Sequence, residues 1–191
     1  MRAVRLTASL LLALPLALGA SQAGKSTAPE SFRANGEITG VAGGVATAMT
    51  FQIDKYTSDA DHDALVKALK DGGNAAFLAA IKKAPKVGVL TIGKSAIDIR
   101  WARTRPEGTD HRRVAFVTDR PAFFAGAGAA DAKPTAGYDL AVVEFTIDAV
   151  GLGSGTMAPA AKVKAGGPNG VEIDDYSGKR ITLTTVTRNV K

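Results

Sequence analysis

The chain contains no cysteine among its 191 residues, and it has only two histidines, His62 and His111. The absence of cysteine excludes disulfide bonds, thiol catalysis, Cys-ligated zinc and iron–sulfur clusters. Aromatic residues make up only 6% of the chain. The rest of the composition, 46% hydrophobic and 22% charged, is that of one globular domain and excludes a collagen-like or ordinary disordered chain. These figures define a structural class and leave the function open.

Long apolar runs are also absent, apart from one at the N-terminus. Arg2 and Arg5 precede an apolar run over residues 10–18, and small residues follow it up to Ala23. This order is typical of a secretory signal peptide, and the run is too short for a spanning helix, which needs about 20 residues. We expect cleavage after Ala23 or after Ala20, a flexible leader over 24–30, and an exported protein that is periplasmic or secreted. No transmembrane segment is expected in the mature chain.

Charge argues against a nucleic-acid partner. Removal of Arg2 and Arg5 with the signal peptide lowers the formal net charge from +6 to +4. A nucleic-acid-binding domain usually carries a denser basic stripe with aromatic residues between the charges. The partner is therefore expected to be a small molecule or a component of the cell envelope.

Alternation of apolar and polar residues predicts a mainly β (α+β) domain over residues 31–191. Met49, Phe51 and Ile53, for example, alternate with polar residues, as in a strand with one buried face. Short strands separated by turn residues indicate an antiparallel barrel or sandwich. About eight strands are expected, near residues 32–38, 49–56, 87–92, 97–101, 114–118, 138–150, 156–164 and 180–188.

A helical insertion interrupts the strands at about residues 57–84. Ser58 is placed to cap a first helix, Gly72 and Gly73 to end it, and Asn74 to cap a second helix that Pro85 ends. The short connection predicts an αα-hairpin. We favour a barrel over a sandwich because such a hairpin suits the open end of a barrel.

Three motifs that suggest chemistry have simpler interpretations. Residues 19–26 match a phosphate-binding P-loop, but they lack the preceding strand and following helix that the loop requires. Residues 59–63 resemble the start of a calcium loop, yet Ala64 and Lys70 occupy the positions that need glycine and glutamate. Acids in a first helical turn explain them better, although a weak surface metal site with His62 stays open. The glycines of 151–155 are interpreted as a tight turn or bulge. No metal site and no cofactor is predicted.

Four segments of the sequence are similar to those of an uncharacterised group of small secreted bacterial β-rich proteins. They are residues 51–56, 99–103, 148–157 and 173–176. The resemblance covers most of the mature chain. It implies a single extracytoplasmic domain, and it implies no activity, cofactor or catalytic residue.

The leading functional hypothesis is a non-enzymatic extracytoplasmic binding protein for a small, partly apolar ligand held in the barrel. Trp101 is expected on the same buried face as its neighbours in the alternating pattern. The same interior residues would also form an ordinary filled core, and a cavity above about 300 Å³ would favour binding. The expected lining residues are Met49, Phe51, Ile97, Ile99 and Phe116.

A second hypothesis is a structural or interaction domain of the envelope that uses a basic hairpin. If the strands pair across residues 106–110, arginines would share a face for an anionic partner, provided that they converge; a solvated hairpin is the alternative. The arginines are Arg100, Arg103, Arg105, Arg112 and Arg113. A hydrolase is the third and least favoured hypothesis, because neither histidine lies in an apolar segment and no nucleophile motif is present. Two carboxylates, or a histidine and a serine, meeting in a cleft would favour it.

Overall fold

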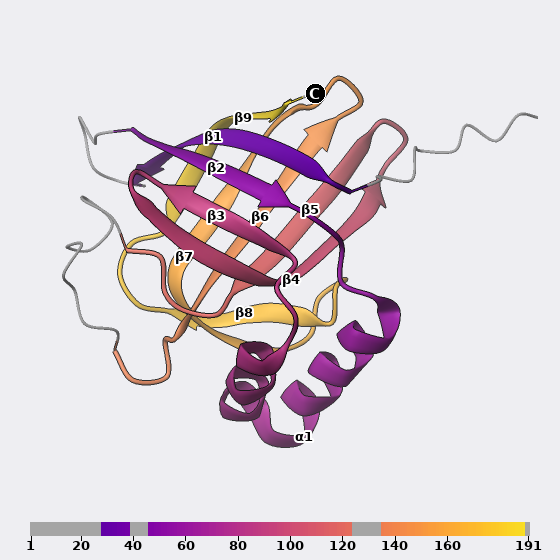
Figure 1. Cartoon of the computed structure of the whole chain (residues 1–191), viewed down its shortest axis with the longest axis vertical. Helices are drawn as coiled ribbons and strands as arrows, with labels where there is room; N and C mark the ends of the chain where they lie inside the picture. The colour runs from indigo at the N-terminus through magenta and orange to yellow at the C-terminus, as the bar shows by residue number, and fades with distance from the viewer. Residues whose placement is uncertain (1–27, 39–45, 124–134, 190–191) are drawn as a thin grey trace, which may run out of the picture.

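The computed structural model describes residues 28–38, 46–123 and 135–189. The predicted signal peptide, most of the leader and the P-loop match lie outside these residues. The described residues form nine strands and one helix (Figure 1). The elements are β1 Glu30–Ile38, β2 Thr47–Ile53, α1 Asp59–Lys83, β3 Gly88–Ile92, β4 Ser95–Glu107, β5 His111–Thr118, β6 Leu140–Asp148, β7 Leu152–Ala165, β8 Val171–Tyr176 and β9 Ile181–Asn189.

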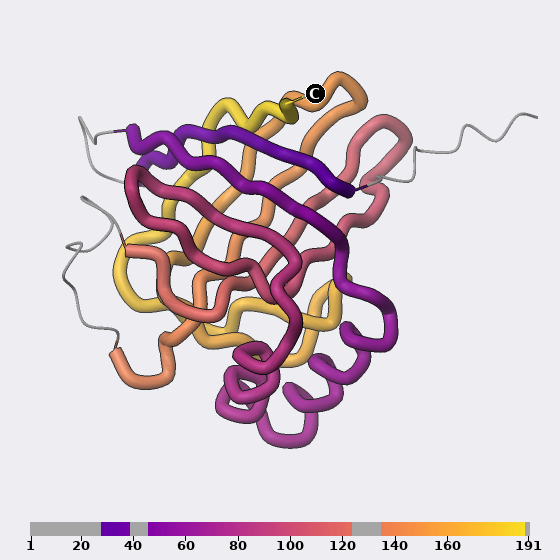
Figure 2. The backbone as a smooth tube through the Cα atoms, in the orientation of Figure 1, coloured from indigo at the N-terminus to yellow at the C-terminus, as the bar shows by residue number. Residues whose placement is uncertain are grey.

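Eight of the strands close into an antiparallel barrel, as the sequence predicted. Strands β1 to β6 pair in chain order, β6 pairs with β7, β7 with β9, and β9 with β1. Figure 2 lets the reader follow the chain around this closed ring. Closure leaves no open edge within the ring. The extra strand β8 was not predicted, because its two apolar residues are followed by acids that disfavour strands.

The barrel interior is packed with apolar side chains. Phe51 lies 5.2 Å from Phe116 and 5.7 Å from Phe145 between ring centroids, and Phe32 lies 5.0 Å from Phe145. The five residues that were expected to line a ligand cavity all belong to this cluster and are at most 4% exposed. Their packing is that of a filled core, the alternative that the sequence left open. These residues are Met49, Phe51, Ile97, Ile99 and Phe116.

Trp101 is a buried core residue, as alternation predicted, but it lies on the outer face of the barrel wall and not with Ile97 and Ile99 in the interior. A register shift between Ile99 and Trp101 interrupts the pairing of β4 with β5. The bulge inserts one residue and reverses which side chains face inward. Ile99 and Ala102 therefore belong to the interior cluster, while Trp101 packs in a second apolar cluster with residues of α1.

Helix α1 covers this second cluster. Ser58 caps the helix by accepting a hydrogen bond from the amide of Asp61 (3.1 Å). Gly73, at φ +64°, breaks the helix. Two helical segments, one on each side of this residue, lie below the barrel (Figure 1). This agrees with the predicted hairpin. The hairpin, however, packs on outward-facing residues such as Trp101 and Val117, because the bulge in β4 places an apolar patch there.

Asn74 has a different role from the predicted helix cap. Its Oδ1 accepts a hydrogen bond from the Val163 amide (2.9 Å), and its Nδ2 donates to the Gly137 carbonyl (3.0 Å). Asn74 therefore joins the helix break to β7.

The glycine-rich segment 151–155 closes the barrel. A Cβ on Gly153 would lie 1.8 Å from the Thr146 carbonyl oxygen, and one on Gly155 would lie 2.2 Å from that of Glu144. Only glycine permits such a close approach of β7 to β6. Gly151, at φ +88°, forms the turn before this seam, so the turn-and-bulge interpretation is confirmed.

Candidate functional site

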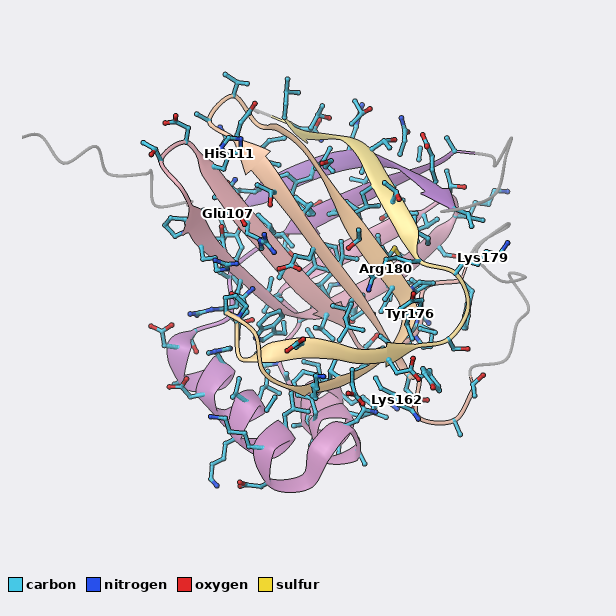
Figure 3. All side chains as sticks on the ribbon, turned by 180° about the vertical axis from the view of Figure 1, so that it is seen from behind. Glu107, His111, Lys162, Tyr176, Lys179 and Arg180 are labelled. Atoms are coloured by element: carbon cyan, nitrogen blue, oxygen red, sulfur yellow. The ribbon has the colours of Figure 1, made fainter. Side chains whose placement is uncertain are left out.

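A groove of about 370 Å³ lies against the outer wall of the barrel, beneath the hairpin of β7 and β8. Figure 3 shows β8 running crosswise over the barrel strands, with Tyr176 and Arg180 at one end. The volume exceeds the roughly 300 Å³ typical of the smallest ligand pockets. The groove is lined by Trp101, Arg113, Ala115, Val117, Val142, Glu144, Thr156, Gly167, Pro168, Asn169, Val171, Glu172, Ile173 and Arg180.

The wall of the groove follows from the register of four neighbouring strands. Trp101 pairs with Val117, and Val117 with Val142, so that one row across the wall is apolar. The next row passes through Ala115, Glu144 and Thr156 and is mixed. Because side chains on alternate positions of a strand share a face, both rows point outward together. The wall is thus apolar at its α1 end and polar further along the strands.

The opposite side of the groove is the edge of β8. Three consecutive residues of this strand, Val171, Glu172 and Ile173, line the groove. Successive side chains of a strand point to opposite faces, so the groove meets the strand from its side. Among the described strands, β8 pairs with β7 alone, and its other edge has no strand partner. Unpaired backbone amides and carbonyls of β8 therefore border the groove.

The two arginines that line the groove, Arg113 and Arg180, have different partners. Arg113 is held by Glu107 and by Glu144, 3.2 Å from its Nη1. Hydrogen bonds from Arg113 and Thr146 lower the pKa of Glu107 to about 2, so this carboxylate is ionised at neutral pH. Arg180 has no ion pair among the described residues, and its guanidinium lies 5.0 Å from the centre of the Tyr176 ring.

His62 holds the indole of Trp101, one of the residues that line the groove. Trp101 donates a hydrogen bond from Nε1 to Nδ1 of His62 at 3.1 Å. Burial and the guanidinium of Arg103 lower the pKa of His62 below its ordinary value of 6.5, against the opposing effect of Asp63 and Asp59. A neutral His62 is required, because only an unprotonated Nδ1 accepts a hydrogen bond.

Acidification is expected to weaken the fold through His62. The unfolded chain takes up a proton at pH 6.5, whereas folded His62 takes it up only at lower pH. The stabilisation that depends on neutral His62 is therefore complete above pH 6.5. It is lost as the pH falls from 6.5 towards the lower pKa of His62 in the folded protein. Trp101 is the chain's only tryptophan, so its fluorescence should titrate with a midpoint below 6.5. His62→Phe should abolish this titration. A midpoint at or above 6.5, or one that persists in that variant, would contradict the assignment.

The five arginines of the predicted basic hairpin do not share one face, although Arg105 and Arg113 lie opposite each other. The hairpin itself forms, with Glu107 paired to His111 across the turn. Arg100 donates to Asp119 (3.2 Å) and to the Ala84 carbonyl (3.0 Å), and Arg103 binds Asp59 at 2.7 Å. Arg100 and Arg103 are therefore directed towards different acids, Asp119 and Asp59, and do not meet at one anion site.

Arg112 and Arg105 lie on opposite faces of the hairpin. Arg112 points into the end of the barrel, where its guanidinium lies 5.7 Å from the Phe32 ring centre. Arg105 lies opposite Arg113 on the outer face, and its buried Nε has no hydrogen-bond partner among the described residues. Alternation along the strands sends Arg112 and Arg113 to opposite faces.

Other candidate sites have less support. A hollow of about 80 Å³ beside Tyr56, Leu65 and Arg100 is much smaller than usual ligand pockets. The described residues contain no group of three potential metal ligands. No helix within the described ranges is long and apolar enough to cross a membrane. Glu144 and Glu172 both line the groove, but Glu144 is paired with Arg113, so the hydrolase hypothesis gains no catalytic pair here.

Comparison with known proteins adds no assignment. The chain matches no protein-family model, no curated protein and no solved structure. Functional inference therefore rests on the groove itself.

Proposed function

We propose that this protein is a non-enzymatic binding protein outside the cytoplasm and that it holds a small, partly apolar ligand in the outer groove. The observation that carries the proposal is a groove of about 370 Å³ whose wall is apolar at one end and charged further along. Ligand sites usually combine an apolar lining with a few placed polar groups. The location outside the cytoplasm is supported by the signal-like N-terminus.

The groove fits this function better than the barrel interior does. The interior is occupied by aromatic rings in mutual contact. The groove instead offers an apolar surface at Val142, a mixed surface at Thr156 and, at Arg180, a cation that has no ion pair within the described ranges. A ligand with an apolar body and polar ends matches this order of apolar, mixed and charged surfaces along the groove.

Filling the groove should abolish ligand retention. Thr156 is an outward-facing, half-buried residue of the wall, and Thr156→Phe places a ring in the groove. The protein would be purified after export without denaturant and weighed by native mass spectrometry. We expect an added mass that is lost on denaturation, and at least a tenfold lower occupancy in Thr156→Phe.

Thr91→Phe is the matched control. Thr91 is also half-buried and outward-facing, but it lies on β3, away from the groove residues. This variant should retain the ligand as the unmodified protein does. Equal occupancy in all three proteins, or no added mass in any of them together with no binding of an apolar fluorescent dye, would refute the proposed function.

A further inference from the structure

We propose that the groove accepts an extended peptide segment, which adds as a strand to the free edge of β8. This inference rests on the proposed function and specifies its ligand class. The peptide would lie between β8 and the outer wall of the barrel, crossing the barrel strands as β8 does (Figure 3).

The edge of β8 is the feature that selects a peptide. The groove meets this strand at Val171, Glu172 and Ile173, and the strand has no described partner on that side. A strand edge presents alternating amide donors and carbonyl acceptors, which an extended peptide matches along its whole length. A ligand without a regular series of amides would leave those groups to water.

One end of the edge is already closed. The Tyr176 amide donates to Oδ1 of Asp175 within the strand (2.8 Å), and the Tyr176 ring contacts Arg180. The part of the edge that borders the groove is therefore Val171 to Ile173. At about 3.3 Å per residue this stretch spans about 10 Å, which suits three paired residues with short overhangs.

The two faces of β8 define the side chains of the peptide. Val171 and Ile173 are partly buried, whereas Glu172 and Asp174 are exposed on the opposite face. Side chains that lie opposite each other on neighbouring strands point to the same face of the sheet. The peptide therefore needs apolar residues beside Val171 and cations beside Glu172. Opposite charges across a strand pair are favourable and like charges are not. No ion pair among the described residues involves Glu172, so its carboxylate is available.

The experiment uses a capped peptide of alternating lysine and valine with a fluorescent label, titrated with the purified protein and read by anisotropy. Two peptides are N-methylated on one or the other set of alternate amides. Only one set can face β8, so methylation of that set should weaken binding about tenfold and methylation of the other set should have little effect. A valine–glutamate peptide should bind about fivefold more weakly or worse.

Protein variants test the charge assignment. Glu172→Lys should reverse the preference between the two peptides, and Asp110→Lys should leave it unchanged, because Asp110 is exposed in the distant β4–β5 turn. Equal effects of the two methylation patterns would overturn strand addition. Failure of every peptide, while an apolar dye still binds the protein and is excluded by Thr156→Phe, would overturn this inference and leave the proposed function standing.

Discussion

Phe51→Ala is expected to lower the free energy of unfolding by about 3–5 kcal/mol, the usual cost of emptying a large core position. Phe51 is fully buried, and its ring packs against those of Phe116 and Phe145. The substitution removes contacts with both rings and leaves a cavity that the closed barrel cannot easily collapse. Urea unfolding followed by Trp101 fluorescence measures the change.

A milder variant separates packing from ligand binding. Phe51→Leu conserves most of the volume and should cost clearly less than Phe51→Ala. Neither variant should change ligand occupancy in the outer groove while the protein is folded. Loss of ligand from a folded Phe51→Leu protein, with little change in stability, would indicate that the ligand binds inside the barrel and not in the outer groove.

Glu30→Ala is the second change with a large expected effect, again about 3–5 kcal/mol. The Glu30 carboxylate accepts two hydrogen bonds from Arg112, at 2.8 and 3.0 Å, and one from the Tyr56 hydroxyl at 2.7 Å. The side chains of Glu30 and Arg112 are only 6% and 14% exposed. Removal of the carboxylate takes away the acceptor of two Arg112 hydrogen bonds and the ion pair with Arg188 at the end of the barrel core.

Two further proteins make this result interpretable. Glu37→Ala changes an exposed acid of the same strand and should cost less than about 1 kcal/mol. The double variant Glu30→Leu with Arg112→Met replaces both charges by apolar groups and should recover most of the stability. A loss in the double variant as large as in Glu30→Ala would show that the ion pair is not the cause. Equilibrium urea unfolding gives all three values.

Alternation was a reliable guide wherever a strand has one face in the core. Phe32, Ala34, Met49 and Phe51 all point inward as the pattern predicts, because the pleat alternates side chains between two faces. The helical insertion was equally visible, since Ser58 and Gly73 carry local signals for its start and its break. The barrel was favoured over the sandwich only because a helical hairpin suits the open end of a barrel. The barrel is confirmed by the pairing of β7 with β6 and β9, whereas the hairpin packs on the outer wall.

The candidate site was beyond the reach of sequence patterns. A single bulge before Trp101 reverses the face of that residue, and no local residue signal marks it. Strand β8 carries three acids in six residues, so its pairing with β7 depends on the neighbouring hairpin more than on its own propensity. The groove requires both features. Its residues come from five strands and two connecting turns, and only the fold brings them together.

The sequence by itself determined the class of this protein: an all-antiparallel β domain with one helical insertion, no thiol chemistry and a signal-like N-terminus. These properties follow from composition and from periodicity, which act over a few neighbouring residues. The tertiary structure alone decided that the interior is filled, that the five arginines do not share one face and that a groove borders an edge of β8 without a partner among the described strands. Those properties depend on register, and a shift of one residue exchanges the buried and exposed faces of a strand.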